Sequence, residues 1–177
     1  SGMAVVLDDD EAEVTSFTAP NESTTLSFDL TVYDEDGNES TDSVSITVIA
    51  NVGYLTISEI QGGSDSSPYI DQLVTTVGYV TGMGEYGFFI QDAQAAWSGI
   101  WVADFGNAIV DVGDEVEVMG LVEEYYELTE INIGDGSYSV LSSNNPIYDP
   151  ISITAFEEAY ESVLVQVSGI CDYDNVD

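Results

Sequence analysis

Hydrophobic and polar residues alternate along two stretches near the N-terminal end of the chain, "TLSFDLTVYD" and "SVSITVIA". Their apolar positions are Leu26, Phe28, Leu30 and Val32, followed by Val44, Ile46 and Val48. Alternation with a period of two is typical of strands that bury one face. The Asp36-Gly37 step between the two stretches favours a hairpin turn. The pattern therefore predicts a β-hairpin over residues 24–49 with one solvated face, and a third strand at the "AVVL" of residues 4–7.

The alternation restarts at "YLTISEIQG", and a loop rich in Gly, Ser and Pro follows at residues 62–68. Five evenly spaced short strands are then expected, in the order "LVTTVGYVTGM", "YGFFIQD", "SGIWVAD", "DEVEVMGLVEEY" and "GSYSVLSS". Glycines stand where these strands would bend, at Gly78, Gly82, Gly87 and Gly120. Short strands that bend at glycines predict a small barrel such as the OB-fold.

The last part of the chain predicts one short helix and one strand. Thr154 and Glu157 have the spacing of a capping box at the start of "TAFEEAY", residues 154–160. The apolar "SVLVQVSGI" follows at residues 162–170. The expected fold is all-β, with a partial immunoglobulin-like sandwich over 1–51, an OB-like barrel over 52–148, and a further lobe or docking segment over 149–177.

The N-terminal motifs "SGMAVVL", "TSFTAP" and "LSFDLTVYDEDGNESTDSVSITV" resemble the PKD-type immunoglobulin-like domains of bacterial surface and secreted proteins. The match resembles the second half of such a domain. The resemblance implies that the remaining strands come from another chain or from another segment of a longer polypeptide.

A second set of motifs resembles the OB-like accessory domain of bacterial secreted nucleases of the endonuclease/exonuclease/phosphatase type. The matching motifs are "ISEIQG", "VTTVGYVT", "GFFIQD", "WSGIWV", "VGDEVEVMGLVEEYYELTEI" and "YESVLVQVSG". In those proteins the nuclease domain is a separate downstream unit, and nothing in this chain matches it. The resemblance therefore implies a fold and an accessory role, with no activity of this chain's own.

Charge is the most unusual property of the chain, because 34 Asp and Glu stand against no Lys, Arg or His in 177 residues. A net charge of −34 repels itself unless cations gather from the medium. Halophilic adaptation is one explanation, although a total loss of Arg goes beyond it. The absence of Lys and Arg also leaves no site for a trypsin-type protease, which would suit a protease-rich extracellular setting.

The missing bases exclude several kinds of chemistry. Serine and cysteine hydrolase mechanisms need an imidazole or lysine base, so we expect no enzyme of that kind. Glycoside hydrolysis by two carboxylates stays a remote alternative. Nucleic-acid binding is not expected either, because affinity for polyanions depends on cationic side chains that neutralise phosphates.

Aromatic side chains of the expected barrel could form stacking platforms, and they are Tyr86, Phe88, Phe89, Trp97, Trp101, Tyr125 and Tyr126. Phe89 and Trp101, with their period-two neighbours, are expected to face the barrel core instead. Exposed Tyr and Trp leave carbohydrate binding open as a further alternative.

Calcium binding is the chemistry that this composition favours, because Ca²⁺ takes oxygen ligands alone. Asp34, Asp36, Asn38 and Asp42 alternate along the Gly-containing turn of "DEDGNESTD". This motif is no EF-hand, since Ser45 stands where the bidentate glutamate would be. An ordinary hairpin turn is the alternative.

Further metal ligands are expected in three other acidic groups, which are Asp8, Asp9 and Asp10, then Asp111 and Asp114, and finally Asp172, Asp174 and Asp177. A solvated loop is the alternative for the first group. The single cysteine, Cys171, excludes an internal disulfide and is expected to be a small buried residue.

Together these observations predict a non-catalytic protein of the bacterial surface or extracellular matrix. We expect self-association into a filament or layer by β-strand addition, with calcium bridging acidic faces. The alternative is an accessory region of a secreted nuclease or other hydrolase. Since the chain has no apolar run of about 18 residues, no membrane span is expected.

Overall fold

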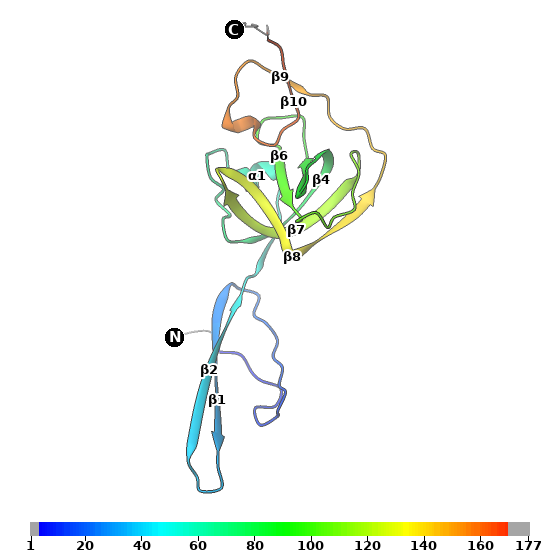
Figure 1. The fold of residues 1–177 in the computed structure, drawn as a ribbon. Helices are drawn as coiled ribbons and strands as arrows, with labels where there is room; N and C mark the ends of the chain where they lie inside the picture. Colours follow the sequence, from blue (N-terminus) through cyan, green and yellow to red (C-terminus); the bar gives the residue numbers. More distant parts are fainter. Residues whose placement is uncertain (1–3, 170–177) are drawn as a thin grey trace, which may run out of the picture. The chain divides into compact units, whose positions relative to one another are not determined.

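The computed structural model describes residues 4–169, except for the side chain of Asp135. The chain forms two compact units, Ser1–Asn51 and Val52–Asp177 (Figure 1). Nearly all of the regular structure in the described part is β-strand, as the alternation predicted.

The first unit is built on the predicted hairpin. Strands β1 (Thr24–Tyr33) and β2 (Glu39–Val48) pair antiparallel, with Leu26 opposite Ile46. We call this two-stranded sheet the ribbon. The prediction of a strand at residues 4–7 is wrong, since only Leu7 of this segment forms a bridge, and its partner is Phe17. The acidic turn that begins at Asp8 carries the chain away from any longer pairing.

The second unit contains the remaining elements, apart from Asn51, the first residue of β3. They are β3 (Asn51–Tyr54), α1 (Ile57–Gln61), β4 (Leu73–Met83), β5 (Gly87–Gln91), β6 (Gly99–Ala103), β7 (Glu115–Tyr125), β8 (Leu128–Ser142), β9 (Ile151–Ile153), η1 (Glu158–Tyr160) and β10 (Val165–Val167). No helix in the described residues is long and apolar enough to cross a membrane.

Five of these strands close into a barrel in the order β4, β5, β6, β8, β7 and back to β4. All neighbours are antiparallel except β6 and β8, which run parallel. This arrangement is OB-like. The interior side chains are fully buried, and they are Val74, Val80, Phe88, Ile90, Ile100, Val102, Val116, Val118, Val122 and Ile131. Helix α1 adds Ile57 and Ile60 to the same core.

The helices differ from the sequence prediction. Helix α1 begins at a capping box, in which the Thr56 side chain accepts from the Glu59 backbone and the Glu59 carboxylate accepts from the Thr56 backbone. Where a helix was expected at 154–160, only one 3₁₀ turn forms, and it has no side-chain cap. The capping-box spacing at Thr154 is therefore unused.

Two strands also differ from the prediction. Strand β8 begins at Leu128, eight residues before the expected "GSYSVLSS", and a register irregularity near Gly120 lets it pair along β7. The strand expected at 162–170 is shortened to β10, which pairs parallel with β9.

Candidate functional site

A groove of about 480 Å³ lies on the outer face of β6, β8 and β7. We call it the aromatic groove. Its rim is formed by Tyr86, Trp101, Phe105 and Tyr125. Its floor contains the polar side chains of Glu123, Glu130 and Asn132.

Strand register explains why these side chains meet. Trp101 on β6 stands opposite Glu130 on β8, and Glu130 stands opposite Glu123 on β7. Because the neighbours Val102 and Ile131 point into the core, the alternate positions point outward. Three strands that are adjacent in space thus deliver one aromatic ring and two carboxylates to one surface.

Glycines make room for Trp101. A Cβ atom on Gly87 would lie 2.5 Å from Cζ2 of Trp101, and one on Gly84 would lie 2.6 Å from Cη2. The indole ring also makes an edge contact with Phe89, with ring centroids 4.6 Å apart. The expectation that Phe89 and Trp101 face the core is therefore wrong. Phe88 and its alternate neighbours fill the interior, and Gly84 and Gly87 leave room for the Trp101 ring on the outside.

The other side chains of the rim are exposed, and local hydrogen bonds hold the turn that carries Phe105. The side chains of Tyr86, Phe105 and Tyr125 are 61%, 57% and 60% exposed. Phe105 has a φ of +56°, and its backbone N–H donates to the Tyr86 carbonyl at 3.2 Å. The buried Asp104 carboxylate accepts from the Gly106 N–H at 2.8 Å, which closes the turn that presents Phe105.

The floor contains one oriented pair and one unpaired carboxylate. Nδ2 of Asn132 donates to Oε2 of Glu123 at 2.9 Å, while Oδ1 of Asn132 accepts from the Gly134 N–H at 2.9 Å. Glu130 is only 6% exposed, and its side chain forms no hydrogen bond with any described residue. Burial raises the pKa of Glu130, and the nearby negative charge of Glu123 raises it further.

This combination is unusual for a structural surface. A largely buried glutamate without a hydrogen-bond partner is costly unless its carboxylate reaches solvent or a ligand, and Glu130 does so only through the groove that it lines. A concave site lined by aromatic side chains with a few convergent polar groups is the usual form of a ligand site. Titratable groups with shifted pKa values mark such sites more often than chance.

The acidic turn between β1 and β2 brings together only part of the predicted calcium set. Oδ1 of Asp34 accepts from the backbone of Asp36 and of Asn38, both at 2.9 Å, and Oδ2 accepts from the Asn38 side chain at 2.8 Å. These bonds lower the pKa of Asp34, with the Asn38 side chain as the largest cause. Asp42 lies on β2 opposite Leu30, away from this turn.

The other predicted ligands also take part in local turns. Asp8 accepts a hydrogen bond from the Ser16 hydroxyl, and Asp9 accepts one from the Glu11 N–H at 3.0 Å. Asp10 lies exposed beside them.

The pair Asp111 and Asp114 shares a turn in which Asp114 Oδ2 accepts from the Asp111 N–H at 2.9 Å. Hydrogen bonds from Ser143 and from that N–H lower the pKa of Asp114. Asp172, Asp174, Asp177 and Cys171 lie outside the described residues. Within residues 4–169 no three acidic side chains converge as a metal site would require, and calcium binding stays a prediction.

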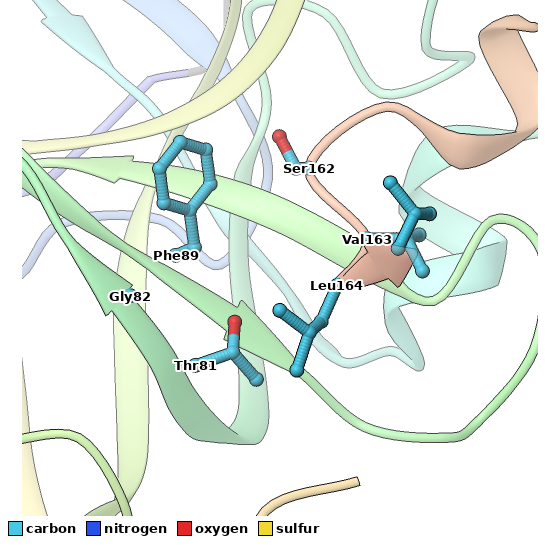
Figure 2. A pocket seen from close by; sticks show the side chains of 7 residues that line it. Thr81, Gly82, Phe89, Ser162, Val163 and Leu164 are labelled. Atoms are coloured by element: carbon cyan, nitrogen blue, oxygen red, sulfur yellow. The ribbon is translucent and has the colours of Figure 1, made fainter. Parts of the chain in front are cut away.

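A second hollow, of about 330 Å³, lies where the C-terminal segment passes β4 and β5. Figure 2 shows Thr81 and Phe89 rising from these strands, with Ser162 and Leu164 opposite them. Its lining is mostly apolar, and no carboxylate faces it. It offers fewer means of selecting a ligand than the aromatic groove.

Comparison with known proteins gives little guidance. No family model matches the chain, and no curated protein matches it. Among solved structures, the hypothetical protein YgiW from E. coli is similar, with a TM-score of 0.34 and 18% sequence identity over 52% of this chain and 90% of that chain. The OB-like assignment rests on the strand pairings described above. The resemblances to PKD-type domains and to nuclease accessory domains stay predictions.

The sequence predicted a third of the residues that line the groove. It identified Tyr86, Trp101 and Tyr125 as possible platforms, but it missed Glu123 and Glu130. Glu130 lies in the part of β8 that was not expected to be a strand. A reading of "LTEINIG" as a strand, with Ile131 inside and Glu130 and Asn132 outside, would have placed them on the face that carries Trp101.

Proposed function

We propose that this chain is a non-catalytic adhesive protein that binds a partner molecule in the aromatic groove. The observation that carries the proposal is the Glu130 side chain, which is only 6% exposed, has no hydrogen-bond partner in the described residues and lines a groove with exposed aromatic rings. The predicted extracellular location and the absence of any Lys, Arg or His agree with a binding role rather than with proton-transfer catalysis.

A ligand panel tests this proposal. Neutral oligosaccharides, organic cations and calcium chloride are titrated separately while tryptophan fluorescence is followed, because Trp101 lies in the groove. Tyr125→Ala should abolish the response to whichever class binds, since Tyr125 is an exposed part of the rim and its loss leaves the core intact. Tyr54→Ala is the matched control, because Tyr54 is 69% exposed and lies outside the groove. A panel without any response that depends on Tyr125 would refute the proposal.

The ribbon supports a second candidate function, which is assembly with further copies of the chain by β-strand addition. In the described residues β1 and β2 pair only with each other, so each keeps an open edge. Phe17 packs on Phe28, with ring centroids 5.1 Å apart, and covers one end of the apolar face. Val44, opposite Phe28, and Leu30, two residues further along β1, stay 56% and 67% exposed.

Assembly is tested by sedimentation in calcium chloride and in a chelator at matched ionic strength. Calcium should favour larger species because it can bridge carboxylates of copies that each carry a charge of −34, an effect that remains at equal ionic strength. Val44→Thr should reduce assembly, because it keeps the side-chain shape and strand preference but removes apolar surface. A chain that stays monomeric in both buffers would exclude this candidate.

A further inference from the structure

The aromatic groove has a pronounced chemical asymmetry: it offers negative charge and aromatic faces, and nothing positive. Glu123 and Glu130 lie on adjacent strands directly opposite each other. The chain contains no Lys, Arg or His side chain that could pair with either of them. A cation that neutralises this floor must therefore come from outside the chain.

The rim indicates which kind of cation fits. Aromatic faces attract cations through the ring quadrupole, and this attraction is greatest for organic cations that are weakly hydrated. Calcium prefers six to eight oxygen ligands, and the groove supplies only two carboxylates and one amide. Oε2 of Glu123 is already held by Asn132, which leaves fewer free oxygens for a metal.

Burial gives a second, independent indication. Only 6% of Glu130 is exposed, yet it lines the groove and accepts no hydrogen bond from the described residues. A largely buried carboxylate of this kind is stabilised by a cation that approaches from the open side. A cation that carries alkyl groups or a flat guanidinium would contact Trp101 at the same time.

We infer that the aromatic groove binds an organic monocation, such as a quaternary ammonium, a primary ammonium or a guanidinium group, between Trp101 and the carboxylates of Glu123 and Glu130. This inference rests on the proposed function and adds the chemical class of the ligand. The group has two natural sources, a free small molecule or a basic side chain of a partner protein.

The test uses the full chain and four salts at equal ionic strength, followed by tryptophan fluorescence and by shifts of the groove amide signals in NMR spectra. Tetramethylammonium chloride represents the small-molecule source, while Nα-acetyl-lysinamide and Nα-acetyl-argininamide represent the side-chain source. Sodium chloride is the reference. We expect at least one organic cation to bind saturably, whereas sodium should not. Tighter binding of tetramethylammonium would indicate a small-molecule ligand, and tighter binding of either amino-acid amide would indicate a basic side chain of a partner protein.

Glu130→Gln is the decisive variant, because it keeps the shape of the side chain and removes its charge. It should weaken cation binding by about ten-fold or more, as the loss of a charge-assisted contact predicts. Glu117→Gln is the matched control. Glu117 is half-buried on the same strand as Glu123, on the same face, and roughly 20 Å away at the usual rise per residue. It should change affinity less than two-fold, as expected for a distant charge screened by salt.

The outcomes separate the two proposals. Binding that is equal for sodium and for organic cations, or equal in Glu130→Gln and the unmodified chain, would overturn the cation inference. A response to neutral oligosaccharides alone that depends on Tyr125 would overturn it as well, while the proposed binding function would stand. The absence of any ligand in the groove would refute both.

Discussion

The ribbon and the barrel are built from strands of similar length and the same alternating pattern, yet they bury very different amounts of apolar surface. In the barrel, Val74 and Val118 on the paired strands β4 and β7 are fully buried. In the ribbon, Val32 and Val44 on the paired strands β1 and β2 are more than half exposed.

Closure accounts for the difference. Each barrel strand pairs on both sides, so the sheet curves on itself and its inner faces cover one another. The ribbon has one pairing per strand in the described residues, and its apolar face receives only the loop that carries Phe17. Alternation therefore determines which side chains share a face, but the number of neighbouring strands determines whether that face is dry.

The largest effect should come from truncation of an aromatic side chain in each unit. Phe88→Ala removes a fully buried ring from the barrel core and should cost about 3–5 kcal/mol of unfolding free energy. Phe28→Ala removes a partly exposed ring of the ribbon and should change the unfolding free energy of the barrel by less than about 1 kcal/mol. Chemical denaturation followed by tryptophan fluorescence measures the barrel alone, because Trp97 and Trp101 both belong to the second unit. A barrel midpoint that Phe28→Ala moves as far as Phe88→Ala would contradict the comparison.

The next largest effect should come from a methyl group added at a glycine. Gly87→Ala places Cβ against the Val102 carbonyl and the indole ring of Trp101, so it should cost about 1–3 kcal/mol and displace that ring. Gly37→Ala in the ribbon turn meets nothing within 4 Å, and its cost comes only from a φ of +78°. Denaturation and near-ultraviolet circular dichroism check both. A Gly87→Ala chain with native stability and native aromatic signals would show that Trp101 is not held as described.

Particular residues show how far the sequence predicts this structure. The hairpin and the bounds of β4 follow from alternation, because both are long and regular. Helix α1 was missed although "TISE" has the capping-box spacing, and the same spacing at Thr154 gave no helix. The difference is tertiary, since Ile57 and Ile60 of α1 are buried in the barrel core and η1 has no buried residue.

The site was harder to predict than the fold for a related reason. Whether Phe88 or Phe89 faces inward depends on the phase of β5 relative to its neighbours, and either phase buries an aromatic ring. Contact between Trp101 and Glu130 depends on the parallel pairing of β6 with β8, which are separated along the chain by β7. Such a pairing is set by barrel closure and leaves no local signal in the sequence.

A smaller effect should appear in the pH dependence of barrel stability. Burial, followed by the negative charges of Glu158 and Glu124, raises the pKa of Glu161 from 4.5 to about 7. Between these values the folded chain holds a proton that the unfolded chain has released, so stability is fully present below pH 4.5 and falls as the pH rises to about 7. Glu161→Gln cannot ionise and should melt at a higher temperature than the unmodified chain at pH 8, with little difference near pH 5.

Thermal melts across this range test the pH effect, and Glu157→Gln is the control, because Glu157 is an exposed neighbour with the same charge. If Glu157→Gln produced the same gain at pH 8, the cause would be the net charge of the chain rather than the burial of Glu161.

The smallest effect should be confined to the turn of the ribbon, where the sequence predicts calcium. Hydrogen bonds, chiefly from the Asn38 side chain, lower the pKa of Asp34, so its contribution to turn stability is present above pH 3.8 and is lost as the pH falls through the lowered value. Asp34→Asn should loosen the turn without any effect on the barrel, and the side-chain amide signals of Asn38 in NMR spectra would move toward their unfolded positions. Asp36→Asn removes the same charge but keeps the acceptor oxygens of Asp34, so it should leave those signals in place.

A calcium titration tests whether the turn binds an ion, because both oxygens of Asp34 already accept hydrogen bonds within the turn. An ion that binds there must compete with Asn38, so calcium chloride should shift the Asn38 amide signals where sodium chloride at equal ionic strength does not. The shift should vanish in Asp34→Asn. Signals that respond equally to both salts would mean that the turn is held by its own hydrogen bonds, and that the ribbon's acidic residues attract calcium only as a diffuse counter-ion.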